Sequence, residues 1–178
     1  AFVGGSQGRG PYRDWFLKIA EENPGPQKVV VITGPESIAN TINTDLAQDI
    51  LTGFIKSEIT RVGVTRAIIN LSGGLDSALS CALAVGALGA ENVLALRLPY
   101  RASSSNSLTD AQRLIDQLGI QSKTIEITDM VDALIKLEPE MSNVRKGNIM
   151  ARARMIVLYD QSEAYKSLAV GTSNKTEI

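Results

Sequence analysis

The stretch that decides the fold is RAIINLSGGLDSALSCALAVGALG, residues 66–89. Its first six residues, Arg66–Leu71, are short, apolar and rich in β-branched side chains, which predicts a buried strand. SGGLDS at Ser72–Ser77 follows, and an apolar run typical of a helix leads from it to Gly89. A strand, a glycine-rich turn and a helix in this order indicate an α/β fold.

The same alternation continues on both sides of this unit. Upstream, apolar residues recur at helical spacing over Thr44–Gly63. Downstream, strands are predicted at Asn92–Leu98, Lys123–Ile127 and Leu168–Thr172, with helices that begin near Ser107, Thr128 and Gly147. We expect Thr44 and Thr128 to cap their helices. Alternating strands and helices form a parallel sheet covered on both faces, so we predict a doubly wound, three-layer α/β/α fold that is Rossmann-like.

Residues 1–43 differ in character from the rest of the chain. GGSQGRG at Gly4–Gly10 and NPGPQ at Asn23–Gln27 are turn or linker sequences. We therefore interpret residues 1–43 as a poorly patterned tail or peripheral segment, and residues 44–178 as the functional domain.

Composition excludes several classes of function. The 178 residues include no histidine and one cysteine, Cys81, so no Ser-His-Asp triad, imidazole zinc site or intramolecular disulfide can form. Lys and Arg number 18 against 19 Asp and Glu, which argues against nucleic-acid binding. Neither an apolar run of membrane-spanning length nor a signal-peptide pattern is evident. We expect a cytoplasmic protein with no membrane or nucleic-acid partner, and Cys81 in its core.

SGGLDS at Ser72–Ser77 is the strongest signal for chemistry. In open α/β sheets, ligands bind at the carboxyl ends of strands, where this loop is predicted to lie. Gly73 and Gly74 let an anion approach the backbone, and the N–H groups of the helix N-terminus favour phosphate. Asp76 would repel a phosphate unless Mg²⁺ bridges the two. The loop predicts a nucleotide phosphate site, and an ordinary glycine-rich turn is the simpler alternative.

The loop resembles the SGGxDS pyrophosphatase loop of enzymes that cleave ATP between its α- and β-phosphates. Other segments resemble the NAD synthetase family: ALRLPYR at Ala95–Arg101, DAQ at Asp110–Gln112, KGNIMARARM at Lys146–Met155 and GTSNKTE at Gly171–Glu177. These segments occur in the family's order from about Thr44 onward. The resemblance implies an ATP pyrophosphatase domain with an adenine nucleotide alpha hydrolase-like fold.

The resemblance also implies roles for individual residues around ATP and Mg²⁺. The ATP-binding residues would be Ser72, Gly73, Gly74, Leu75, Asp76, Ser77, Arg97 and Thr172. Asp76 and Ser77 would be the catalytic residues. Asp76 and Glu177 would hold the Mg²⁺ cofactor.

A second set of residues would hold the other substrate, deamido-NAD. By resemblance these are Asn148 and Arg152. They are four residues apart on a predicted helix and therefore share one face. Arg154 is two residues from Arg152 and points elsewhere, so both arginines cannot line one site.

The implied activity is the ATP-dependent amidation of deamido-NAD to NAD through an acyl-adenylate, with AMP and pyrophosphate released. No glutaminase domain fits in this chain, so ammonia is the expected nitrogen donor, and family resemblance implies a homodimer. Because the family pattern carries further contacts beyond Ile178, we expect the domain to be truncated at its C-terminal end. Three alternatives stay open: glutamine as donor, a GMP synthetase-like adenylating ligase, and an ATP- or AMP-binding module without turnover.

Overall fold

The computed structural model describes residues 43–101, 103 and 105–173. Backbone contacts divide the chain between Phe54 and Ile55, and the sheet with its covering helices belongs to the second unit, Ile55–Ile178. The segment interpreted as a tail lies outside the described residues except for Asn43. The domain boundary after residue 43 therefore stays a prediction.

A parallel sheet forms the centre of the second unit. Among the described residues it has four strands in the order β3-β2-β1-β4. The strands are β1 (Ala67–Asn70), β2 (Val93–Arg97), β3 (Gln121–Thr124) and β4 (Leu168–Val170). The central strands β1 and β2 are almost wholly buried, apart from their half-buried last residues. Burial on both faces explains why these strands read as continuous apolar runs rather than as alternating patterns.

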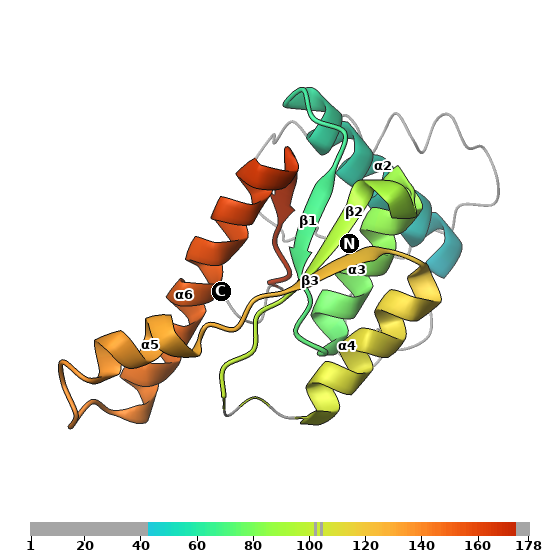
Figure 1. Ribbon diagram of the computed structural model, residues 1–178. Coiled ribbons are helices and arrows are strands. Elements are labelled where there is room, and N and C mark those ends of the chain that lie inside the picture. The colour runs from blue at the N-terminus through green and yellow to red at the C-terminus, as the bar shows by residue number, and fades with distance from the viewer. Residues whose placement is uncertain (1–42, 102, 104, 174–178) are drawn as a thin grey trace, which may run out of the picture. The chain divides into compact units, whose positions relative to one another are not determined.

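Helices cover both faces of the sheet (Figure 1). The described helices are α2 (Thr44–Arg61), α3 (Leu75–Leu88), η2 (Ala90–Asn92), α4 (Ser105–Leu118), α5 (Thr128–Ile135) and α6 (Asn143–Tyr165). On one face α3 and α4 pack against the sheet in a core cluster that includes Cys81 and Ile115. On the other face α5 and α6 pack around Val131 and Val157. The predicted three-layer α/β/α fold and the buried position of Cys81 are confirmed.

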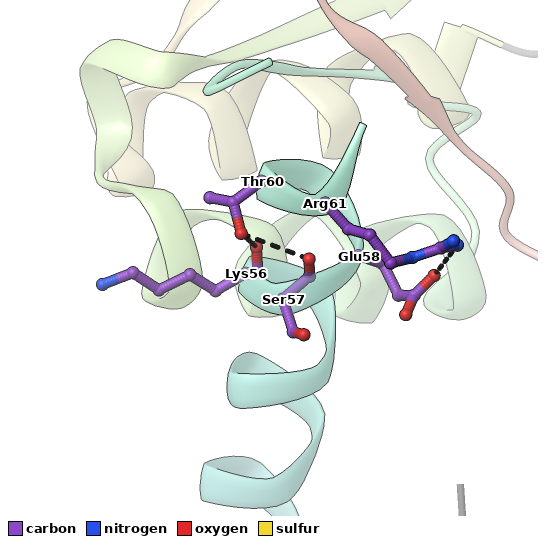
Figure 2. A network of polar contacts seen from close by, with 5 residues as sticks. All are labelled: Lys56, Ser57, Glu58, Thr60 and Arg61. Carbon is purple, nitrogen blue, oxygen red and sulfur yellow. Dashed lines mark hydrogen bonds and ion pairs between the residues drawn. The ribbon is translucent and has the colours of Figure 1, made fainter. Parts of the chain in front are cut away.

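Local polar contacts close the C-terminal end of α2 (Figure 2). The Thr60 hydroxyl donates to the carbonyl oxygens of Lys56 at 2.8 Å and of Ser57 at 3.2 Å. Arg61 forms an ion pair with Glu58 at 2.6 Å. These contacts lie on the polar side of the helix end, while the buried Ile59 on the same turn packs into the core.

The N-caps of two helices differ from the prediction. The side chain that caps α2 is Asn43, whose Oδ1 accepts from the backbone N–H of Leu46 at 3.0 Å, and Thr44 is the first helical residue. In α5 the N-cap position is Ile127, and no side chain caps it. The Thr128 hydroxyl is used elsewhere, since it accepts from the backbone N–H of Arg101 at 3.0 Å. Both helices therefore begin one residue earlier than predicted, with Thr44 and Thr128 as their first helical residues and not as their caps.

The third strand is also displaced from its predicted position. Strand β3 covers Gln121–Thr124, two residues before the apolar run at Lys123–Ile127. Residues in β3 are exposed because it lies at an edge of the described sheet. Backbone pairing does continue beyond it, since the N–H of Ile125 donates to Arg97 and that of Ile127 to Pro99, both at 2.9 Å. The apolar residues of this run, Ile125 and Ile127, pack into the core just after the strand ends.

Candidate functional site

The loop Ser72–Ser77 connects β1 to α3 at the carboxyl edge of the sheet, as predicted. Gly73 has φ +87°, and a Cβ built there would lie 2.3 Å from the backbone oxygen of Ser107. Only glycine fits this position, because both the left-handed backbone and the close approach exclude a side chain. Gly74 has an ordinary φ of −85° and is the N-cap residue of α3. The loop is thus packed directly against the start of α4.

The side chain of Ser77 stabilises the loop through hydrogen bonds to other loop residues. Its side chain is 3% exposed, and its hydroxyl donates to the carbonyl oxygen of Gly74 at 2.9 Å. The hydroxyl oxygen of Ser77 also accepts from the backbone N–H of Ser72 at 3.2 Å and lies 3.0 Å from the Ser72 hydroxyl. In this arrangement Ser77 shapes the loop, while the more exposed Ser72 faces the adjoining cavity.

A cavity of about 350 Å³ opens at the carboxyl ends of β1 and β2. Two of the residues that line it were predicted ATP-site residues, Ser72 and Arg97. The remaining lining residues are Asn70, Leu71, Leu98, Pro99, Ser103, Ser107, Leu108 and Arg154. Two arginines and three serines therefore surround this space, and no acidic residue is among the described residues that line it.

Arg97 is held at the cavity by a residue of α4. Its Nη1 donates to Oε1 of Gln112 at 2.6 Å, and Nε2 of Gln112 donates in turn to Asp116 at 2.8 Å. The Nε of Arg97 is buried and has no hydrogen-bond partner in the described structure. Buried polar atoms of this kind call for an explanation such as a missing ligand or water. The arrangement is suited to a bound anion.

Arg154 is the lining residue that sequence reasoning missed. It lies on α6, and its Nε donates to the carbonyl oxygen of Leu98 at 3.0 Å. Burial lowers the pKa of its guanidinium below the ordinary value. A signal was available, because position 154 lies four residues after Met150 and four before Leu158, which both pack in the core. Helical spacing thus places an arginine on an apolar stripe.

The predicted deamido-NAD residues lie on a different face of α6. Asn148 and Arg152 are both exposed. Neither is among the residues that line the cavity in the described part of the chain. The expectation that Arg152 and Arg154 point to different places agrees with this geometry.

Four further residues were predicted to belong to the ATP site or the metal site, namely Leu75, Asp76, Thr172 and Glu177. Leu75 and Asp76 are exposed in the first turn of α3. Thr172 follows β4, and the pairing of Ile69 with Val170 brings the end of β4 to the same sheet edge as the loop. Glu177 lies outside the described residues. The topology thus gathers the loop, Arg97 and Thr172 at one edge.

The donor set is compatible with a magnesium ion held chiefly by a nucleotide. Magnesium in nucleotide sites is commonly bound by one or two carboxylates together with phosphate oxygens and water. Asp76 supplies one exposed carboxylate beside the glycine loop. Within the described residues no three acidic or cysteine side chains converge into a complete metal cage. The exposed carboxylate of Asp76 beside the loop therefore fits an ion shared with a phosphate.

A parallel sheet with a glycine loop and two arginines at its carboxyl edge defines the architecture of an α/β nucleotide-binding protein. Comparison with protein families then sharpens this class: residues 47–178 match the model of the family described as NAD synthase. The chain belongs to the NAD synthase family.

Known relatives agree with this assignment. An NH3-dependent NAD+ synthetase of Chlorobium phaeovibrioides is 52% identical over 137 residues, 77% of this chain and 50% of the relative. The solved NH3-dependent NAD synthetase from Campylobacter jejuni, in complex with nitrate, has a TM-score of 0.73 at 39% identity and covers 77% of this chain and 59% of that chain. A glutamine-dependent NAD+ synthetase from Acinetobacter baumannii, in complex with ADP, also has a TM-score of 0.73, at 32% identity over 83% of this chain and 28% of its own. The chain spans about half the length of the curated relatives it matches.

No helix in the described ranges is long and apolar enough to cross a bilayer. The longest of them, α6, carries Arg152 and Arg154 near its middle.

Proposed function

We propose that this chain carries the nucleotide-binding part of an enzyme that amidates deamido-NAD to NAD at the expense of ATP. The observation that carries the proposal is the loop Ser72–Ser77, packed beside an arginine-lined cavity in a chain of the NAD synthase family. The ammonia-dependent Chlorobium relative supports ammonia as the nitrogen donor.

The reaction requires two transfers that balance without a protein nucleophile. A carboxylate oxygen of the nicotinate group attacks the α-phosphorus of ATP, and the bond to the β-phosphate oxygen breaks to release pyrophosphate. Ammonia then attacks the carbonyl carbon of the acyl-adenylate, which releases AMP and one proton and leaves the amide. The absence of histidine from the 178 residues is compatible with this chemistry.

The protein's part is positioning and charge neutralisation. The first turn of α3 offers backbone N–H groups that have no intrahelical acceptors, which suits a phosphate. Arg97, held by Gln112, adds a fixed positive charge. Mg²⁺, when bound between Asp76 and the phosphates, would neutralise further negative charge, and Glu177 is the proposed second carboxylate.

The exposed face of α6 supports a homodimer as the working form. Asn148 and Arg152 share this face with Met155 and Tyr159, since the four positions follow helical spacing. Large apolar side chains are exposed over α5, α6 and the loop between them: Leu134, Leu137, Val144, Met155, Ile156 and Tyr159. A second copy of the chain that covered this face would bring its own substrate residues to the subunit boundary. Sedimentation should show a dimer, and Tyr159→Asp should shift it to monomer; a wild-type monomer at high concentration would count against this.

The activity is tested by incubating a complete form of the enzyme with ATP, Mg²⁺, deamido-NAD and ammonium, and by separating the products chromatographically. Equal amounts of AMP and NAD are expected. ATP binding without AMP formation would favour a binding module. Replacing ammonium by glutamine tests the nitrogen donor, and xanthosine monophosphate in place of deamido-NAD tests the GMP synthetase-like alternative. A cytoplasmic location stays a prediction from the sequence.

A further inference from the structure

We propose that Arg154 is a phosphate-binding residue of the cavity, where it acts with Arg97 on the polyphosphate of the bound nucleotide. The identity of that nucleotide rests on the proposed function. The anion-binding role itself is argued from the surroundings of Arg154, which is absent from the set of site residues that resemblance suggested.

The first step is how Arg154 is anchored. Its Nε donates to the carbonyl oxygen of Leu98, the residue directly after β2. This hydrogen bond restrains the guanidinium group, which carries five N–H donors in a rigid fork. In the described structure the two Nη atoms have neither a hydrogen-bond partner nor an ion-pair partner, and the side chain lines the cavity. The donors that suit bidentate binding of a phosphate are left available.

The second step is the uncompensated charge. Arg154 is half-buried, and burial lowers its pKa, yet an arginine keeps its charge in proteins. Charged groups that leave water are normally paired, because an unpaired buried charge is costly. No described carboxylate pairs with Arg154, and none lines the cavity beside it. An anion in the cavity would supply the missing partner.

The third step is the convergence of donors on one space. Arg154 comes from α6, Arg97 from β2 and Ser72 from the glycine loop, and all three line the same cavity. Arg97 brings a guanidinium group whose Nη1 is held by Gln112 and whose side chain lines the cavity. Two cations and a hydroxyl on three separate elements define a site for an anion with several oxygens, such as a pyrophosphate group.

Calorimetric titration with inorganic pyrophosphate, ATP and adenosine tests this directly. The variants are Arg154→Gln, which removes the charge, and Arg154→Lys, which keeps it but loses the fork. Arg113→Gln is the matched control, because Arg113 is a 78% exposed arginine paired with Asp110 on α4. Thermal unfolding of each variant reports whether the loss of the Leu98 contact disturbs the fold.

For Arg154→Gln we expect pyrophosphate and ATP to bind about tenfold to a hundredfold more weakly, in line with the loss of charge-assisted hydrogen bonds. Arg154→Lys should fall between this variant and the wild type. Adenosine, which carries no phosphate, should bind all variants equally, and Arg113→Gln should bind every probe like the wild type.

Several results would overturn the proposal. The first is an unchanged pyrophosphate affinity in Arg154→Gln. The second is an equal loss of affinity for adenosine and ATP, which would indicate a structural role only. The third is the lack of saturable pyrophosphate binding by the wild type. Failure of the proposed function is a separate result. A chain that binds pyrophosphate through Arg154 but forms neither AMP nor NAD would retain the anion site and lose the amidation activity.

Discussion

Nη1 of Arg97 donates to Oε1 of Gln112 over 2.6 Å, and this bond joins the end of β2 to α4. The contact holds one side of the guanidinium group against the protein while the side chain also lines the cavity. Gln112 belongs to the short DAQ segment, Asp110–Gln112, for which the sequence analysis predicted no role. In the structure, Gln112 positions the side chain of Arg97.

Gln112→Leu should therefore weaken ATP binding. The change removes the acceptor of Arg97 and leaves a second guanidinium nitrogen without a partner, in addition to the buried Nε. We expect about a tenfold loss in ATP affinity by calorimetry, and a loss of about 1.5 kcal/mol in the free energy of unfolding for a half-buried, charge-assisted bond. Gln112→Glu keeps the acceptor and should retain more affinity. Wild-type affinity in a folded Gln112→Leu variant would show that Arg97 is not held in this way.

Gly73→Ala should be among the most damaging substitutions in the loop. The new Cβ would meet the backbone oxygen of Ser107 at 2.3 Å, and the φ of +87° is unfavourable for alanine. Urea unfolding should show a loss well above the 1–2 kcal/mol or so that the left-handed backbone alone costs. Gly119→Ala is the matched control, because Gly119 has φ +65° with nothing within 4 Å of its Cβ position. Equal losses in the two variants would contradict the packing of the loop against α4.

The dependence of ATP binding on Mg²⁺ should require the carboxylate of Asp76. In the wild type we expect ATP to bind more tightly with Mg²⁺ than with a chelator present, because a carboxylate and phosphate oxygens together hold the ion. Asp76→Asn should abolish this difference and reduce turnover severely. Asp129→Asn is the control, since Asp129 also lies in the first turn of a helix, α5, and is exposed. If both variants kept the wild-type dependence on Mg²⁺, Asp76 would not be a ligand.

Cys81 should behave as an inert core residue. Its side chain is 0% exposed, and burial raises its pKa from 9.0 to about 11. Since the thiolate is the reactive form, iodoacetamide at pH 8 should label the native chain slowly and the urea-unfolded chain quickly. Rapid labelling of the native chain would contradict the buried position.

The same shift predicts a pH dependence of stability. The unfolded thiol loses its proton near pH 9.0, whereas the folded thiol keeps it until about pH 11, so its contribution is present below pH 9.0 and is lost across this window. The free energy of unfolding should therefore fall more steeply in the wild type than in Cys81→Ala between these pH values. Parallel curves would show that Cys81 makes no such contribution.

The chemistry of the loop was predictable because it depends on neighbours in sequence. A strand, two glycines and a helix start are consecutive, so their spacing places Ser72–Ser77 at the carboxyl edge of the sheet without any long-range information. Arg154 was harder, because its position depends on the rotation of α6 about its axis. The packing of α6 into the core through residues such as Val157 sets that rotation, and it carries Arg154 to the cavity and Arg152 to the outer face.

The sequence by itself determined the α/β class, the parallel sheet, the buried Cys81 and the family to which the loop belongs. These follow from local periodicity and from motifs whose residues are adjacent. The tertiary structure alone decided that Ser77 fastens the loop, that Gln112 holds Arg97 and that Arg154 lines the cavity. The contacts of Gln112 and Arg154 join residues 15 and 56 positions apart, and the direction of the Ser77 hydroxyl depends on the loop conformation. Such relationships arise only when the helices have packed on the sheet, because packing fixes which face of each helix looks inward.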